Sequence, residues 1–157
     1  MKHKYTRLTF LFLISLLSST NAAADLSVEG YWASIDEKTE KVTGYWKLEV
    51  VSNRLLGYLV NYPELKPDDV CDKCTGEIQE FFEKPITGTA WINLSVNKDG
   101  VWEEGYIIDS GEGEKYKARI WVEDGNLKMR GYLGVLYRTQ TWRRSNQIEA
   151  ENAIFDG

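Results

Sequence analysis

The chain of 157 residues is acidic, with 24 aspartates and glutamates against 19 lysines and arginines and a formal net charge of −5 at pH 7. Because an acidic chain repels phosphate backbones, nucleic acid is a poor partner. The single histidine, His3, lies at the N-terminus. The rest of the chain therefore lacks the side chain used in Ser-His-Asp catalysis and in His-ligated metal sites, and we expect neither a metal nor another cofactor.

The N-terminus has the pattern of a signal peptide. Residues 1–7 are basic, residues 8–17 (LTFLFLISLL) are uncharged, and Ala22 and Ala24 are the small residues that precede a cleavage site. An uncleaved anchor is the alternative, although about ten apolar residues span only about half a bilayer as a helix. We expect residues 1–24 to be removed as a signal peptide.

Cleavage after residue 24 removes three basic residues and no acidic one, which leaves 24 acidic against 16 basic residues and a net charge of −8. No later segment is apolar enough to be an integral membrane span. We therefore expect a periplasmic or secreted protein in an oxidising compartment.

Short, aromatic-rich runs separated by turn residues predict eight β-strands. In residues 42–51, Val42, Trp46 and Leu48 alternate with polar side chains, a period of two that is typical of a half-buried antiparallel strand. The predicted strands are residues 28–34, 42–51, 54–61, 88–97, 101–109, 114–122, 126–133 and 137–144.

The connections between these strands favour a meander. Turns rich in Asn, Asp and Gly at 97–100, 109–113 and 123–126 join consecutive strands as hairpins. Closing the meander removes both exposed edges. We predict an all-β fold, an eight-stranded antiparallel up-and-down barrel in residues 25–144, with a two-sheet sandwich as the alternative. Residues 145–157 show no strand pattern and are interpreted as a flexible, frayed or loosely helical tail.

The longest connection, residues 62–87, contains the only two cysteines, Cys71 and Cys74. This C-x-x-C could be a redox catalyst, half of a zinc site or a disulfide. Asp69 and Asp72 flank Cys71 and disfavour a reactive thiolate, and a zinc site needs four ligands. We predict a Cys71–Cys74 disulfide that shapes the long loop, and redox or metal roles remain alternatives.

Two groups of carboxylates are candidates for other chemistry. The acidic residues of the long loop, which could bind calcium but lack the EF-hand spacing, are Asp68, Asp69 and Asp72. The residues that could supply a carboxylate pair for glycoside hydrolysis are Glu103, Glu104, Asp109 and Glu112. Acidic side chains in loops and near hairpin ends are usually solvated, so we predict no catalytic residue.

Six tryptophans lie on six different predicted strands. Aromatic side chains favour strands and fill cores, so a barrel filled by its own side chains is one interpretation. The other is a cavity lined with rings that binds a small apolar ligand. The candidate ligand-binding residues are Trp46, Trp142, Tyr132 and Arg130.

Seven sequence blocks follow one another along nearly the whole mature chain. They are VEGYWAS, TGYW, DDVCDKCTGE, KPITG, GYIIDSGEGEKYKARI, LKMRGYLG and RTQTWRR. In this order they resemble an exported bacterial family called domain of unknown function 2147 (DUF2147). The chain departs from the family pattern at Asp109-Ser110, where the family usually has Asp-Pro. The resemblance implies an exported location and a fold rather than a reaction.

A second resemblance concerns the two ends of the predicted barrel. The sequence Gly30-Tyr31-Trp32 opens the first strand and Arg143-Arg144 ends the last. This arrangement is similar to that of calycins, the superfamily of lipocalins, fatty-acid-binding proteins and avidins. The resemblance implies that Arg144, or with less support Arg143, stacks on Trp32 where the barrel closes and donates hydrogen bonds to backbone carbonyls.

Two classes of function remain open. The first is an exported protein that binds a small apolar ligand, and the second is a structural or protein-interaction module of the bacterial envelope with a filled barrel. A carboxylate-based hydrolase is a third and less favoured interpretation, because the mature chain has no evident nucleophile–base pair. We therefore expect a binding protein rather than an enzyme.

Overall fold

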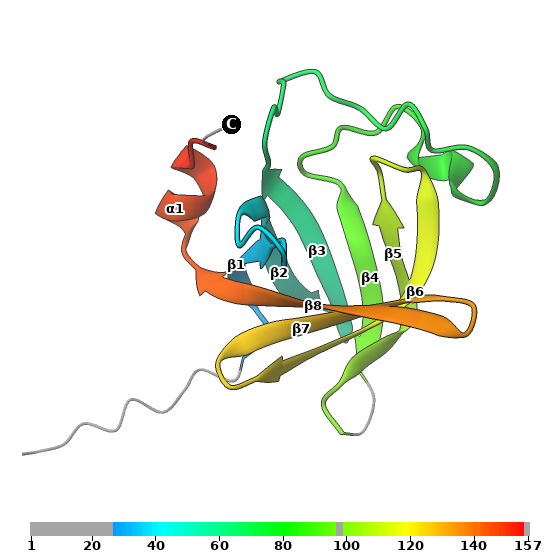
Figure 1. Ribbon diagram of the computed structural model, residues 1–157. Helices are drawn as coiled ribbons and strands as arrows, with labels where there is room; N and C mark the ends of the chain where they lie inside the picture. The colour runs from blue at the N-terminus through cyan, green and yellow to red at the C-terminus, as the bar shows by residue number, and fades with distance from the viewer. Residues whose placement is uncertain (1–26, 97–98, 156–157) are drawn as a thin grey trace, which may run out of the picture.

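The computed structural model describes residues 27–96 and 99–155, so the predicted signal peptide lies outside the described residues. Eight antiparallel strands follow one another around a closed barrel (Figure 1), which confirms the predicted fold. The strands are β1 Gly30–Ile35, β2 Val42–Val51, β3 Arg54–Asn61, β4 Ala90–Val96, β5 Trp102–Asp109, β6 Glu114–Glu123, β7 Asn126–Leu133 and β8 Leu136–Ser145. Each predicted strand boundary lies within two residues of the observed one.

Tight hairpins set the order and register of the strands. The turn between β2 and β3 places Ser52 and Asn53 at φ values of 51° and 61°, and Asp124 between β6 and β7 has φ 51°. Positive φ at turn positions produces a backbone twist that matches that of the flanking strands. The meander closes where β1 pairs with β8, with Trp32 opposite Arg144.

One end of the barrel is filled by its own side chains. Alternation along each strand directs large apolar residues inward, and they form a continuous buried core. Its members are Val28, Trp32, Leu48, Leu55, Ile92, Leu94, Ile107, Ala118, Ile120, Leu127 and Trp142. These residues lie toward the β2–β3 and β6–β7 turns, so this end of the barrel is closed.

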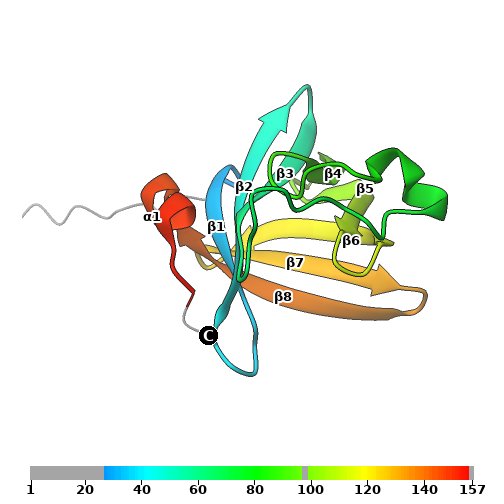
Figure 2. The same cartoon turned by 90° about the horizontal axis from the view of Figure 1, so that it is seen from above.

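The long connection between β3 and β4 crosses the other end and packs against the outside of the barrel (Figures 1 and 2). It includes the short 3₁₀ helix η1, Gly76–Phe81. A second core of buried residues lies beneath it, formed by Cys71, Cys74, Ile78, Ile86, Trp91 and Ile108. The indole of Trp91 on β4 donates a hydrogen bond of 2.6 Å to the carbonyl of Ile86. The connection is thus an ordered part of the fold.

Of the expectations for residues 145–157, a flexible, frayed or loosely helical tail, the structure of residues 145–155 shows the helical one, docked against the barrel. Helix α1, Gln147–Asn152, begins at Asn146, whose side chain accepts a hydrogen bond from the backbone N–H of Glu149. Ala150 is fully buried against the barrel in a small cluster with Ala33 and Tyr45. The helix is too short to be stable alone, so this docking is what holds it.

No helix among the described residues is long and apolar enough to cross a membrane.

Candidate functional site

The closed end of the barrel is held by one arginine and one tryptophan. Trp32 is fully buried, and the Arg144 guanidinium carbon lies 3.9 Å from the centroid of its ring. The same guanidinium donates hydrogen bonds of 2.7 Å to the carbonyls of Glu29 and Ser27. Arg144 therefore joins the last strand to the segment before the first, in the arrangement that the resemblance to calycins implies.

Gly30 makes this contact sterically possible. Its φ is +116°, a conformation that other L-residues rarely adopt, and a Cβ at this position would lie 3.2 Å from Nη1 of Arg144. Arg143, the less favoured candidate, points elsewhere and pairs with Glu149 of α1 at 2.7 Å. The structure thus separates two neighbouring arginines into a barrel-closing residue and a helix-docking residue.

The opposite end of the barrel holds a pocket of about 900 Å³. Two tryptophan side chains, Trp46 of β2 and Trp142 of β8, form its floor. Their rings stack, with centroids 5.3 Å apart and an angle of 21° between the ring planes. Ile107 and Met129 extend this apolar floor across the barrel. The core described above lies beneath it, so the pocket has a closed bottom, and its mouth lies between the long connection and the β7–β8 hairpin.

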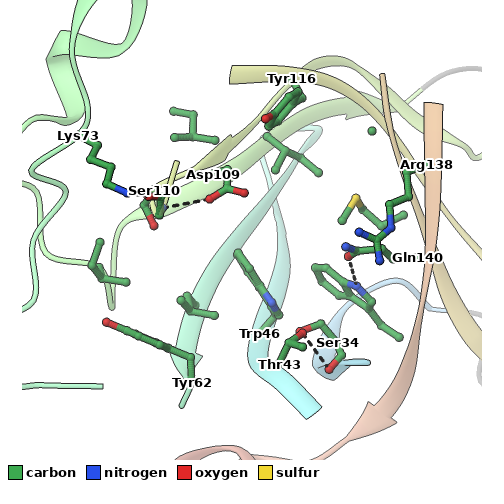
Figure 3. Close-up of a pocket in the computed structure, with 18 of the residues that line it drawn as sticks. Ser34, Thr43, Trp46, Tyr62, Lys73, Asp109, Ser110, Tyr116, Arg138 and Gln140 are labelled. Carbon is green, nitrogen blue, oxygen red and sulfur yellow. Dashed lines mark hydrogen bonds between the residues drawn. The ribbon is translucent and has the colours of Figure 1, made fainter. Parts of the chain in front are cut away.

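Polar groups line the wall of the pocket nearest to β1 and β8 (Figure 3). The hydroxyls of Ser34 and Thr43 lie 2.9 Å apart, and the indole N–H of Trp142 donates to Oε1 of Gln140 at 3.2 Å. Arg138 lies above Gln140 on the same strand, and Figure 3 draws no hydrogen bond from its guanidinium to another pocket residue. Hydrogen bonds from Thr39 and Lys38 lower the pKa of Asp36, and the charge of Arg138 contributes to this shift. The pocket thus combines an apolar floor with a few polar groups on one wall.

The long connection supplies the other side of the mouth. Tyr62 donates a hydrogen bond of 2.5 Å to Oδ2 of Asp69, which also accepts from the backbone N–H of Lys66. The bonds from Tyr62 and Lys66 hold the pKa of Asp69 below its usual value. Burial, with the neighbouring carboxylate, raises the pKa of Tyr62, so this tyrosine stays a neutral donor at neutral pH.

The disulfide predicted from the sequence is present, and it shapes this part of the mouth. Cys71 and Cys74 are bonded and fully buried. Between them, Lys73 donates a hydrogen bond of 2.6 Å to the carbonyl of Gly111 in the β5–β6 turn. A Cβ on Gly113 would lie 2.3 Å from the Lys73 carbonyl oxygen. The cysteine segment therefore sits directly on the β5–β6 turn, where Asp72 and Lys73 border the pocket.

The four predicted ligand residues do not all lie in the pocket. Trp46 and Trp142 form its floor, and Tyr132 borders its mouth. Arg130 is a correction, since it lies on the outer face between Trp121 and Tyr137, 5.4 and 4.4 Å from their ring centroids. The physical reason is strand alternation: Met129 and Gly131 line the pocket, so the side chain between them must point outward.

Sequence reasoning missed three pocket residues that alternation could have found. Met129 and Gly131 lie two residues apart on β7 and share a face with Leu127, which is buried in the core. Arg138 shares a face of β8 with Gln140 and Trp142. Tyr62 and Lys73 carried no comparable signal, because their positions depend on how the long connection folds.

Two of the four carboxylates considered for glycoside hydrolysis, Glu103 and Asp109, are engaged in structural contacts. Glu103 forms an ion pair with Arg119 at 2.7 Å, and Asp109 accepts hydrogen bonds from the N–H groups of Gly111 and Glu112 in the β5–β6 turn. Glu103 and Asp109 lie near opposite ends of β5. Within residues 27–96 and 99–155, no three Cys, His, Asp or Glu side chains are grouped so that they could hold a metal ion.

A closed, eight-stranded up-and-down barrel with an arginine–tryptophan contact at one end and a pocket at the other defines a lipocalin-like protein. The chain belongs to the family described as uncharacterized protein conserved in bacteria (DUF2147), whose model matches residues 30–144. This agrees with the resemblance read from the sequence blocks. Among curated proteins, none matches the chain.

The fold is also similar to that of a solved structure, protein HP1028 from the human pathogen Helicobacter pylori, which belongs to the lipocalin family. The TM-score is 0.65 at 14% sequence identity, and the alignment covers 81% of this chain and 88% of HP1028. At this identity the similarity establishes the fold alone.

Proposed function

We propose that this protein is an exported binding protein for a small, mainly apolar molecule that carries one polar end. The observation that supports this most strongly is the pocket of about 900 Å³ above the stacked rings of Trp46 and Trp142. Pockets for small molecules are typically concave, mostly apolar and about 300–1,000 Å³ in volume, with a few polar groups that fix the orientation of the ligand.

The polar groups indicate how such a molecule would lie. Its apolar body rests on the two tryptophans and on Met129, because these side chains form the floor. Its polar end lies near Arg138 and Gln140, because the Arg138 guanidinium has several hydrogen-bond donors and Figure 3 draws none of them bonded to another pocket residue. An anionic or hydrogen-bond-accepting end group is therefore favoured over a cationic one.

Two observations favour binding over catalysis. The part of the sequence that follows His3 has no histidine, and two of the candidate carboxylates, Glu103 and Asp109, are held by an ion pair and by a turn. Export is supported by the N-terminal sequence pattern and by the disulfide, which persists in oxidising compartments. The periplasm or the secreted space is thus the proposed location.

Tryptophan emission tests the proposal. Titration with fatty acids, isoprenoids and aromatic metabolites is expected to give saturable quenching or a blue shift with at least one class, because the ligand would contact Trp46 and Trp142. Gly131→Leu should abolish the change in emission. Gly131 lines the pocket and a Cβ there would meet no atom within 4 Å, so the leucine side chain fits without a clash and occupies the space of the ligand.

The matched control is Lys117→Leu, which adds an apolar side chain on the exposed outer face of the neighbouring strand. It should bind as the wild type does. If no compound class changes the emission of the wild type, or if Gly131→Leu responds equally, the proposed binding function is wrong.

A further inference from the structure

The hairpin that joins β7 to β8 exposes apolar side chains at its tip. Leu133 and Leu136 are each 68% exposed, Val135 is 97% exposed and Tyr137 is 61% exposed. They pair or adjoin across Gly134, so they form one contiguous surface rather than scattered single residues. Clustered apolar exposure of this kind marks an interaction site.

Basic and aromatic residues follow the apolar tip in a fixed order along the hairpin. Moving away from Val135, the register pairs Leu133 with Leu136, then Tyr132 with Tyr137, then Gly131 with Arg138, and then Arg130 with Thr139. Residues 126–142, which leave out the helix-docking Arg143 and the barrel-closing Arg144, contain three arginines and lysines and no aspartate or glutamate, in a chain whose net charge is −5. The hairpin is therefore a basic element in an acidic protein.

This order matches the polarity of a lipid bilayer surface. Aliphatic side chains suit the acyl region, tyrosine rings suit the boundary, and arginines suit the phosphate layer. A protein partner would need a larger complementary area than four side chains at a hairpin tip provide. The tip of the hairpin projects beyond the wall formed by β6 in both views of the barrel (Figures 1 and 2), on the same side of the molecule as the long connection.

We propose that the tip of the β7–β8 hairpin inserts into the interface of a lipid bilayer. Leu133, Val135 and Leu136 enter the acyl boundary, and Arg130 and Arg138 contact lipid phosphates. Leu133, Leu136 and Tyr137 also border the mouth of the pocket, so docking brings the mouth to the membrane surface. The docking surface shares Leu133, Leu136, Tyr137 and Arg138 with the rim of the pocket, but docking does not require a bound ligand.

Vesicle flotation tests the docking with no added ligand. The exported protein is mixed with vesicles of phosphatidylcholine containing about one third phosphatidylglycerol, which supply anionic phosphates. We expect the wild type to float with the vesicles and Val135→Asp to reduce the partition coefficient about tenfold or more, because a charge replaces an inserted aliphatic side chain.

The matched control is Ile154→Asp. Ile154 is 91% exposed and follows α1, the helix that lies on the opposite side of the barrel from the hairpin (Figures 1 and 2). This variant should float as the wild type does. Docking is refuted if the wild type does not float, if Val135→Asp floats equally well, or if Ile154→Asp loses as much binding.

A second measurement separates this proposal from the ligand proposal. Val135 does not line the pocket, so Val135→Asp should keep the thermal unfolding midpoint and any ligand-dependent change in tryptophan emission of the wild type. Loss of flotation with an unchanged midpoint supports docking. Loss of flotation together with a lowered midpoint would show that Val135→Asp unfolds the hairpin. Val135→Ser, which adds no charge, is then the deciding variant. If Val135→Ser folds and floats as well as the wild type, the proposal is wrong.

Discussion

Arg143 and Arg144 are adjacent in the sequence but contribute to different parts of the structure. Arg144 stacks on a fully buried ring and donates two hydrogen bonds to backbone carbonyls. Arg143 forms one half-exposed ion pair with Glu149. A cation–π contact with charged hydrogen bonds stabilises a fold more than a surface ion pair does.

Replacing Arg144 by alanine is therefore expected to lower the free energy of unfolding by about 2 kcal/mol or more. The matched Arg143→Ala should lower it by less than about 1 kcal/mol, because solvent screens the ion pair. Urea denaturation followed by tryptophan emission measures both. Equal losses in the two variants would contradict the assignment of barrel closure to Arg144.

The hydrogen bond from Tyr62 to Asp69 makes the mouth of the pocket sensitive to acid. Because the folded-state pKa of Asp69 lies below its usual value of 3.8, the bond contributes stability above that value, and this contribution disappears as the pH falls through the lowered pKa. Tyr62→Phe should thus melt at a lower temperature than the wild type at about pH 7, and the difference should shrink as the pH falls below the lowered pKa of Asp69. Because phenylalanine keeps the ring, a difference that stays constant in acid would mean that the hydroxyl acts through something other than the ionised carboxylate.

At the residue scale, the alternation of apolar and polar residues along a strand predicted which side chains face the interior better than amino-acid composition did. Trp46 could be assigned to the interior because polar residues occupy the alternate positions of its strand. Arg130 was named as a candidate ligand-binding residue without the same test, and the structure places it outside, since its neighbours Met129 and Gly131 face inward. The sequence contained the information for the correct assignment of Arg130.

The cysteine-containing connection is an element with its own core. Cys71 and Cys74 pack with Ile78, Ile86 and Trp91 on the outside of β4, away from the main core of the barrel. The backbone of Cys71 also forms two hydrogen bonds of 3.0 Å, with Lys84 and Glu83. The disulfide thus closes a small ring inside a segment that already has other tethers.

Reduction of the disulfide should therefore lower the melting temperature by only a few degrees, because a short ring removes little entropy from the unfolded chain. Faster amide hydrogen exchange should be confined to residues 69–86 and the β5–β6 turn, on which Lys73 rests. Exchange measured with and without reductant by mass spectrometry tests this. Global unfolding on reduction would show that the barrel depends on the bond.

At the element scale, the strands were predictable, whereas the docking of α1 against the barrel was not. Hairpin residues such as Asn53, Asp124 and Gly125 mark strand ends locally, which explains why the boundaries agree so closely. Helix α1 depends on Ala150 packing against Ala33 and Tyr45, residues more than a hundred positions away. No local pattern reports such a contact, so the sequence suggested a tail.

For the whole molecule, the sequence predicted the barrel but not how much of it is filled. The two interpretations, a filled barrel and a ring-lined cavity, both fit six tryptophans on six strands. The structure separates them by position: Trp32 fills the closed end, whereas Trp46 and Trp142 form the floor of an open pocket. The height of each ring along the barrel axis depends on the stagger between neighbouring strands. This stagger is fixed only when the sheet closes into a barrel, so the sequence of a single strand does not report it.

The central claim, that the pocket holds a small molecule, is tested most directly by native mass spectrometry of the protein purified from its own host. We predict a species heavier than the bare chain by the mass of one small molecule, which is released on denaturation and absent from Gly131→Leu. The claim would be contradicted if the wild type showed only the mass of the bare chain, as Gly131→Leu is expected to do.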